Sequence, residues 1–501
     1  MSKNFQQIKI EMTEGNSGIT PNASLLFTAK FFEQSGLSES INVNIGARKS
    51  KGASDSQHIM AMVISQICGG DAIEHQKYLL PRVGILGIDV PSVSACRSYM
   101  REFHNNEEDH KRGMGRNFIP EANAYLSGFE KIHAHVFETA YRLSPLKSVT
   151  LDQDATFIYT NRPETCSNYK GQTSYAAFNT YCPEYDVILG TRYSDGNVTP
   201  GFRQLEEFKR VLSLLPDGVK HVKLRSDSAG YQADLIKYCA NSDNKRFGAI
   251  DFAISCDVGH EFKASASMVP DSEWRPLRRS KDDITRLEWA EVSYAPNSLS
   301  RSKDTPEIRF YAVREAFRQP RSVGSNTKDV PGQRKLDIQF TEDQINELES
   351  GYVELKKLHL TLMSGRIYKL FGIASNIMDQ PGDEIILWHR ERCGKSEQAH
   401  DVLKNDFGGS HVPSYHFGIN AAWWNIAVLS MNVINVMKRF FLPSGYEACR
   451  MKKLRYVFFT LAGKLVTHAR CKILKLYSWD AGANLLMYAI NKLDSVMPCV
   501  T

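Results

Sequence analysis

The chain has 501 residues, of which 42% are hydrophobic and 24% are charged, a composition ordinary for a soluble globular protein. A chain of this length exceeds a single compact core, so we expect two to four domains. The formal net charge of +6 permits a polyanionic partner without requiring one. No run of about 18 apolar residues occurs, so we expect no membrane span, and the first residues lack the basic and apolar regions of a secretion signal.

The 10 cysteines are scattered along the chain, and none forms a C-x-x-C pair. This spacing disfavours a zinc site and is typical of free thiols in a reducing compartment. We therefore expect a cytoplasmic protein.

The first part of the chain is predicted to be helical. Residues 1–22 are expected to form a leader, and residues 23–148 a helical region that binds DNA or dimerises. Apolar residues recur at helical spacing in 56–67 and again in 117–141.

Within that region, Ser92 is predicted to cap the N-terminus of a short helix over 93–103. This helix would present Arg97 and Arg101, four positions apart, on one face. The pair is either part of a solvated helix face or belongs to a helix-turn-helix element whose arginines contact DNA.

Beyond about residue 148 the pattern changes to strands that alternate with helices, which predicts a mixed sheet flanked by helices. We assign 149–245 to the first part of this mixed-sheet core. The expected strands are 151–159, 186–193 and 219–224, and the expected helices are 205–215 and 232–240.

Sequence patterns typical of β-strands begin again at 247–256 and recur at 288–294 and 307–317. These strands predict an inserted, mainly β subdomain over 246–362. The polar segment 319–335, with Pro and Gly at its ends, is expected to be a mobile loop.

A strand over 366–375 and a helix over 382–403 are assigned to the second part of the core, residues 363–415. Residues 416–501 are expected to form a helical, basic C-terminal domain. Its basic side chains are either the flanks of an ordinary helical domain or a surface that follows DNA phosphates. They are Lys438, Arg439, Arg450, Lys452, Lys453, Arg455, Lys464, Arg470, Lys472 and Lys475.

Three acidic residues carry the functional hypothesis. Asp154 lies in a predicted strand, Asp227 follows a short apolar strand, and Glu397 lies on a predicted helix with Lys404 seven positions later. Each alone is a common turn, cap or surface residue. Together, two strand-end aspartates and a helix-borne glutamate can hold a pair of divalent cations that cleave or transfer phosphodiesters.

Other side chains near this predicted edge have two interpretations. We expect Asp154 to face the metal and Asp152 to point to the opposite sheet surface. Lys170 and Arg225 lie beside the proposed site, as do Gln172 and Arg192; each of these four would either hold DNA phosphates or serve as a surface charge or salt-bridge partner.

The Asp154-Ala155-Thr156 strand, the Asp-Ser-Ala-Gly-Tyr turn at 227–231 and the Glu-x6-Lys helix resemble bacterial insertion-sequence transposases of the DDE type. The resemblance covers roughly residues 25 to 490. Its nearest subgroup has the signature Tyr-x2-Arg-x3-Glu-x6-Lys. Counted back from the glutamate, this chain has Arg390 and Cys393 at the tyrosine and arginine positions, with Arg392 one place off.

The resemblance implies a multidomain α+β protein. Its ribonuclease-H-like, mixed-sheet core would be interrupted by a β insertion and flanked by helical N- and C-terminal domains.

The resemblance also implies the site. Asp154, Asp227 and Glu397 would be the ligands of Mg²⁺, for which Mn²⁺ is expected to substitute. Lys404 would contact phosphate near the transposon end, and Arg392 is the candidate for the signature arginine. Some members of this class flip a base against a tryptophan of the insertion; here Trp274 is either that residue or packing.

The function implied is two-metal cleavage of double-stranded DNA at transposon ends and strand transfer into target DNA, by a homodimer on DNA in a prokaryotic cytoplasm. One alternative is a metal-dependent nuclease on the same fold that does not join strands. Another is a DNA-binding derivative without catalysis. A hydrolase of small phosphoesters is disfavoured by the basic C-terminal segment.

Overall fold

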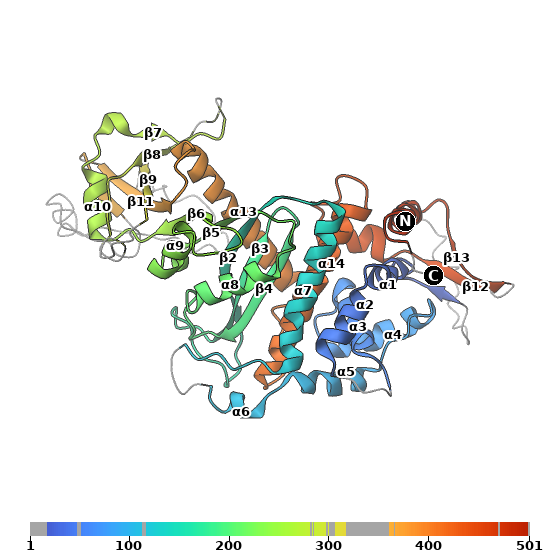
Figure 1. The fold of residues 1–501 in the computed structure, drawn as a ribbon. Coiled ribbons are helices and arrows are strands. Elements are labelled where there is room, and N and C mark those ends of the chain that lie inside the picture. The colour runs from blue at the N-terminus through green and yellow to red at the C-terminus, as the bar shows by residue number, and fades with distance from the viewer. Residues whose placement is uncertain are drawn as a thin grey trace, which may run out of the picture.

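The computed structural model describes residues 18–47, 52–112, 117–280, 283, 285–296, 299, 306–316, 360–364, 366–468 and 471–498. Most of the predicted leader and the whole of the predicted 319–335 loop lie outside these residues. The described part is a mixed α+β structure. As Figure 1 shows, its large sheet runs through one lobe into the middle of the molecule, and helices cover the other end.

The first part of the chain is helical, as predicted. Ser92 is the N-cap of α5, and its Oγ accepts a hydrogen bond from the Ala95 N–H at 3.3 Å. The helices are α1 (Leu25–Gln34), α2 (Leu37–Ile45), α3 (Asp55–Ile67), α4 (Gln76–Gly84), α5 (Val93–Met100), α6 (Asn106–Asp109) and α7 (Ala124–Leu143), with 3₁₀ turns η2 (Ile73–His75) and η3 (Arg101–Phe103).

Five strands form the central part of the sheet, in the order β4-β3-β2-β5-β6. The pairs β2·β3 and β3·β4 are antiparallel, whereas β2·β5 and β5·β6 are parallel. The strands are β2 (Ser148–Tyr159), β3 (Ser174–Cys182), β4 (Val187–Asp195), β5 (His221–Ser226) and β6 (Asp251–Cys256), and α8 (Gln204–Leu214) and α9 (Ala233–Ala240) lie between them in the chain.

Strand β3 was not predicted from the sequence. All nine of its residues are buried, because both of its edges are paired and both of its faces are covered. A strand buried on both faces loses the alternation of polar and apolar residues by which a strand is recognised.

The sheet continues beyond β6 through antiparallel strands, in the order β6-β11-β9-β8-β7, with β10 paired to β11. We expected 246–362 to form a separate insertion, yet β6 lies inside those residues and pairs with β5, so one 10-stranded sheet joins both regions. The elements of this lobe are α10 (His260–Ser267), η5 (Asp271–Glu273), β7 (Arg275–Pro276), β8 (Leu287–Glu291), β9 (Arg309–Ala316), β10 (Leu360–Met363) and β11 (Arg366–Ser375).

Two long helices connect the parts. Helix α13 (Gly382–Asn405) packs against β2, β5, β6 and β8. Helix α14 (Phe417–Phe441) lies beside α7 and β4 (Figure 1) and is almost wholly buried, including Trp423 and Trp424. The Asn432 side chain binds both the N–H and the carbonyl of Ile188 at 2.9 and 2.8 Å, beside a register shift between β3 and β4.

Among the helices of the described residues, α14 is long and apolar enough to cross a membrane. Its most apolar window is 94% buried inside the protein. The core helix of a soluble protein has the same length and composition, so this finding does not indicate a membrane span.

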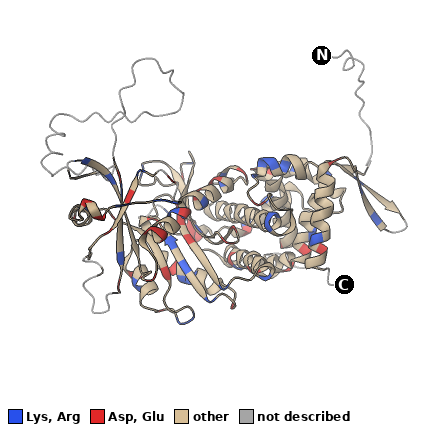
Figure 2. Ribbon diagram, turned by 90° about the horizontal axis from the view of Figure 1, so that it is seen from above, with Lys and Arg blue, Asp and Glu red and all other residues tan. Residues whose placement is uncertain are grey.

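The C-terminal part was expected to be helical, but 463–468 and 471–476 form antiparallel strands that project from the end of the molecule and carry exposed lysines (Figures 1 and 2). The two strands pair with each other, and β1 adds a short third strand at Gly463 and Lys464. The elements are β1 (Ile19–Thr20), α15 (Met451–Leu454), the π-helical turn η6 (Arg455–Phe459), β12 (Gly463–His468), β13 (Cys471–Leu476) and α16 (Ala481–Val496).

Some of the predicted phosphate-binding cations are engaged inside the protein. Arg455 donates to the carbonyls of Ile67 and Gln66 at 2.7 and 2.9 Å, where they end α3. Lys438 is buried beside the Cys449 carbonyl. These two side chains therefore hold the fold together and are not available to DNA.

The buried His133 predicts a pH dependence of stability. Its Nε2 lies 3.1 Å from Asn425 Oδ1, and burial lowers its pKa to about 4. In the unfolded chain its pKa is about 6.5. Between these values the unfolded state binds a proton that the folded state does not, so the free energy of unfolding falls as pH falls through this window, by up to about 1.4 kcal/mol per unit.

Thermal unfolding of the wild type and His133→Asn between pH 7.5 and 4.5 measures this contribution. We expect the variant to lose stability less steeply as the pH is lowered. His110→Asn, which changes an exposed histidine, should follow the wild type. Equal slopes for all three proteins would show that His133 does not titrate in this way.

Candidate active site

The structure brings Asp154 and Asp227 together. Strands β2 and β5 are parallel neighbours in which Gln153 pairs with Ser226, so the two aspartates occupy the next position on each strand. Asp227 also caps the turn η4 (Ser228–Gly230), because its Oδ1 accepts a hydrogen bond from the Ala229 N–H at 3.0 Å. The carboxyl ends of parallel strands are where α/β proteins commonly build their sites.

The charges of the two aspartates interact. Burial raises the pKa of Asp227, and the negative charge of Asp154 raises it further. Burial also raises the pKa of Asp154. The Arg392 guanidinium lowers both values, since its positive charge faces this pair of acids. A site of this kind favours the binding of additional positive charge.

One face of α13 covers Asp154. Arg392 Nη1 lies 3.4 Å from Asp154 Oδ2, Ser396 Oγ donates to the same oxygen at 3.1 Å, and His400 Nδ1 lies 3.9 Å from it. These residues are spaced four apart and therefore share a helix face. The sequence analysis did not single out Ser396, although this spacing is the signal that would have identified it.

Glu397 and Lys404 lie at an adjoining cleft. This cleft has a volume of about 290 Å³ and is lined by residues 157–159 of β2 and by Glu397 and Lys404 of α13. Lys404 Nζ donates to Thr156 Oγ1 at 2.9 Å. Glu397 is exposed, whereas Asp154 and Asp227 are partly buried. Two of the three predicted metal ligands are thus adjacent, and the third lies on the wall of the next cleft.

Arg225 does not face DNA. It is 1% exposed, and its Nε and Nη2 bind Asp152 Oδ1 and Oδ2 at 2.6 and 2.8 Å. Its Nη1 donates to the Trp388 carbonyl at 2.6 Å and lies 3.3 Å from Glu391 Oε2. This placement contradicts the prediction that Arg225 holds DNA phosphates, because every guanidinium nitrogen has a protein partner.

We had expected Asp152 to point to the opposite sheet surface, but the structure shows that it does not. Residues two apart on a strand share a face, so Asp152 and Asp154 both face α13. The parallel register pairs Asp152 directly with Arg225. This pairing explains why one aspartate of the strand binds arginine while the other lies beside Asp227.

Trp274 is a packing residue in this structure. It is 6% exposed, and the Arg314 guanidinium lies 4.1 Å from the centre of its ring. Arg314 is held there by Glu288 at 2.8 Å and by Asp271 at 3.1 Å. The indole therefore has no exposed face on which a flipped base could stack, which supports the packing interpretation of Trp274.

The predicted DNA contacts in loops and in the first helices are exposed, whereas Arg192 of β4 is 9% exposed and donates to the Phe202 carbonyl. Lys170 lies in the loop between β2 and β3 with its ammonium 5.5 Å from the Tyr169 ring centre. Arg97 binds Glu74 at 2.6 Å across the surface, and Arg101 begins η3. Their contact with DNA stays a prediction.

The buried ion pair between Asp152 and Arg225 predicts how a mutation of Asp152 changes stability. Asp152→Asn leaves the Arg225 guanidinium in the interior without its counter-charge, which should lower the free energy of unfolding by about 3–5 kcal/mol. The control Asp494→Asn alters a surface pair with Lys30 at 2.7 Å and should cost about 1 kcal/mol or less. Chemical denaturation measures both. A variant of Asp152 that keeps wild-type stability would show that the pair does not stabilise the fold in this way.

Comparison with known proteins gives no family assignment. No family model matches the chain, and no curated protein matches it. A solved structure with partial similarity is described as the cryo-EM structure of a piggyBac transposase synaptic complex with hairpin DNA. It is 9% identical over 95% of this chain and 80% of that chain, with a TM-score of 0.39. At this TM-score the superposition is too loose to establish a shared fold.

Proposed function

We propose that this chain is a DNA transposase of the DDE type, encoded by a bacterial insertion sequence and acting in the cytoplasm. The observation that carries the proposal is the pair Asp154 and Asp227. These carboxylates lie side by side at the ends of parallel strands, beneath a helix that supplies Arg392, Glu397 and Lys404. Their residue types and chain order are those on which the sequence resemblance rests.

The sheet supports the same proposal. We assign β2 to β6, three antiparallel strands followed by two parallel ones, to a ribonuclease-H-like core, and β7 to β10 to its β insertion. Strand β11 then returns the chain to β6, and α13 follows it. This order brings the glutamate-bearing helix back to the two aspartates after the insertion.

The donor atoms fit the metal that the proposal requires. Mg²⁺ prefers oxygen ligands, and Asp154 and Asp227 offer carboxylate oxygens, while Glu397 lies on the wall of the adjoining cleft. Asp154 accepts from the Ala155 N–H at 2.9 Å through Oδ1 and from Ser396 Oγ at 3.1 Å through Oδ2. Asp227 accepts from the Ala229 N–H at 3.0 Å through Oδ1. When bound, a pair of Mg²⁺ or Mn²⁺ ions supplies an activated water or 3′-hydroxyl and stabilises the leaving oxygen.

The residues of the chain position the reactants. Arg392 balances the charge of the two aspartates, and its side chain is 9% exposed. Lys404 lies on the adjoining cleft wall, within reach of the next phosphate along a strand. We assign Arg392 and Lys404 to phosphate binding, and the Asp152–Arg225 pair to positioning of the helix that bears them.

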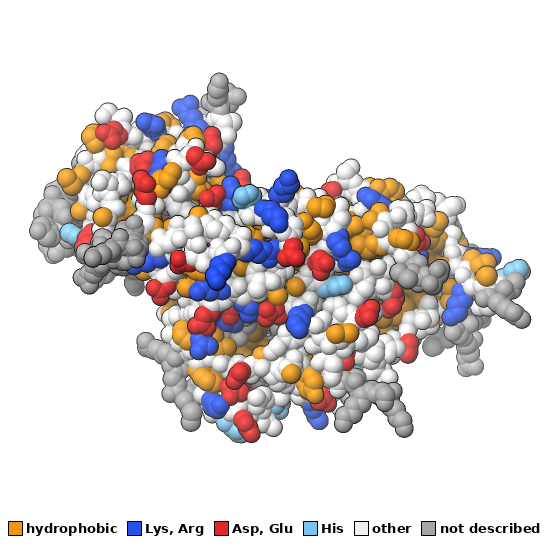
Figure 3. Space-filling view, viewed as in Figure 1, with side chains coloured by type: hydrophobic (Ala, Val, Ile, Leu, Met, Phe, Trp, Pro, Cys, Tyr) orange, Lys and Arg blue, Asp and Glu red, His pale blue; other side chains and the backbone are white. Residues whose placement is uncertain are grey.

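The proposed partners are the transposon ends and target DNA, bound by a homodimer because transposition joins two ends. Figure 3 shows basic and acidic side chains interspersed over the visible face. The net charge of +6 is therefore not gathered there into one large patch. Local cations at the site, with the exposed lysines of β12 and β13, are the proposed means of holding DNA.

The first test uses purified protein, Mg²⁺ and a DNA fragment that carries the flanking ends of the element. Asp154→Asn, Asp227→Asn and Glu397→Gln each remove a proposed metal ligand, so cleavage should fall by more than about 100-fold. Glu384→Gln changes an exposed carboxylate of the same helix and should retain wild-type cleavage and joining.

The outcomes separate the alternatives. Cleavage without joined products would indicate a nuclease. Specific end binding without cleavage by the wild type would overturn the catalytic proposal and leave a DNA-binding protein. Full activity of Glu397→Gln beside inactive aspartate variants would place the third ligand elsewhere on α13.

Lys404→Gln tests the proposed phosphate contact. We expect weaker binding of transposon-end DNA and a log-log salt dependence of affinity whose slope is smaller by about 1, because one counterion fewer is released. Lys131→Gln, on the exposed face of α7, should keep the wild-type slope. Fluorescence anisotropy over a range of salt concentrations measures both; an unchanged slope for Lys404→Gln would exclude the contact.

A further inference from the structure

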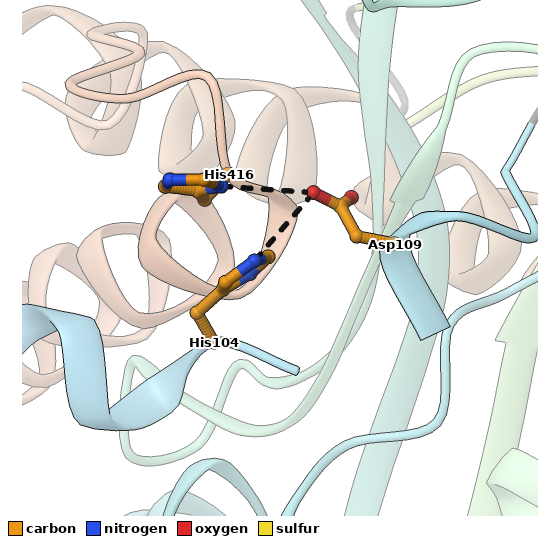
Figure 4. A group of neighbouring side chains, drawn as sticks. All are labelled: His104, Asp109 and His416. Carbon is orange, nitrogen blue, oxygen red and sulfur yellow. Dashed lines mark ion pairs between the residues drawn. The ribbon is translucent and has the colours of Figure 1, made fainter. Parts of the chain in front are cut away.

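A second group of metal-ligating side chains lies apart from the acidic residues. His104, Asp109 and His416 each offer a ligand atom, and these atoms all lie within 4.8 Å of one another. Figure 4 shows both imidazoles directed toward Asp109. His104 Nε2 is 3.8 Å from Asp109 Oδ2, and His416 Nδ1 is 3.9 Å from the same oxygen.

Each side chain is brought there by a defined element. His104 follows η3, Asp109 is the last residue of α6, and His416 is the N-cap residue of α14. The His416 side chain makes no capping hydrogen bond, so helix capping does not explain its orientation. The two imidazole rings lie 4.1 Å apart, centre to centre.

The two oxygens of the Asp109 carboxylate have different partners. Its Oδ1 accepts a hydrogen bond from Arg112 Nη1 at 2.7 Å, which fixes the plane of the carboxylate. Its Oδ2 faces the two histidines. Arg112 in turn binds Asp195 of β4 through two hydrogen bonds of 2.8 Å each. Arg112 thereby links the Asp109 carboxylate, whose Oδ2 faces the histidines, to β4 of the sheet.

The buried histidine has the chemistry of a ligand. The His104 side chain is 9% exposed and directs its Nε2 toward Asp109. Its other ring nitrogen, Nδ1, is buried without a hydrogen-bond partner. Asn106 Oδ1 lies 2.7 Å from His104 Nε2 and adds a fourth candidate donor.

We propose that His104, Asp109 and His416 bind a divalent cation of the zinc class. Two imidazole nitrogens and one carboxylate oxygen are the ligands that Zn²⁺ takes at about 2.0–2.2 Å. Tetrahedral ligands at that range lie about 3.4 Å apart, so closing the site needs shifts of about 1 Å or less. The exposed His416 can make such a shift, and Asn106 or water fills the fourth position.

This site differs in chemistry from the proposed catalytic one. Imidazole nitrogen selects Zn²⁺ and its neighbours, whereas an all-oxygen set selects Mg²⁺. The cysteine spacing had disfavoured zinc, but histidine and aspartate supply the ligands here. The bound ion would link the segment around α6 to the start of α14 and, through Arg112, to β4. It therefore stabilises the fold and takes no part in DNA cleavage.

The test uses the full chain, stripped of metal with a chelator, and does not depend on DNA cleavage. Calorimetric titration with Zn²⁺ should show one tight site per chain, and Zn²⁺ should raise the thermal midpoint because it binds the folded state. Co²⁺ should give the visible absorption bands of a four-coordinate nitrogen and oxygen site. Mg²⁺ should produce neither effect.

The matched variants are His416→Gln and His110→Gln. His416 is 52% exposed in its side chain, so its replacement should leave the fold intact while weakening Zn²⁺ binding at least tenfold and abolishing the Co²⁺ bands. His110→Gln alters an exposed histidine next to Asp109 and should bind like the wild type. Absence of a stoichiometric Zn²⁺ site in the wild type, or undiminished binding in His416→Gln, would overturn the proposal.

Discussion

The candidate site depends on the buried ion pair between Asp152 and Arg225. This pair joins the three elements that carry the site, because Asp152 belongs to β2, Arg225 to β5, and the Trp388 carbonyl to α13. Removing two charges from water is costly, and a buried pair is weak evidence for net stability. Its geometric effect is the more important one. The bidentate pair between Asp152 and Arg225 fixes β2 against β5, and the hydrogen bond from Arg225 to the Trp388 carbonyl fixes where α13 crosses these strands.

The positions of the active-site side chains follow from that alignment. Asp154 lies two residues beyond Asp152, and Asp227 two residues beyond Arg225, so the register that pairs the first two also places the carboxylates side by side. Arg392 lies one helical turn beyond Trp388 and thus reaches Asp154. The same helix that is anchored by its backbone therefore supplies the cation that balances the acids.

The sequence predicts the local features of this arrangement and not its long-range pairs. Asp154 and Asp227 were identifiable because strand and turn patterns are local, and the apolar strands around them are short and well bounded. The partner of Arg225 depends on the register between strands 73 positions apart in the sequence, which no local pattern specifies. Strand β3 was missed for a different reason, because burial on both faces removes the alternation by which a strand is recognised. Strands β12 and β13, which pair mainly with each other, were also missed. In the remaining cases the outcome depended on how exposed the side chain is. Trp274 is of a residue type that can stack on a base, but it is packed like a core residue.

The two candidate cation sites differ in how the fold holds their ligands. At the aspartates, two rigid strand ends set the acids, and the opposing charge comes from α13, so the site is preorganised before any ion binds. At His104, Asp109 and His416, the ligands come from short or terminal elements, and Arg112 anchors only one of them to the sheet. An ion there would complete the packing between the first helices and the start of α14. Rigidity at the first site suits chemistry, which needs fixed geometry before the reaction. The looser second site suits an ion whose binding energy contributes to folding.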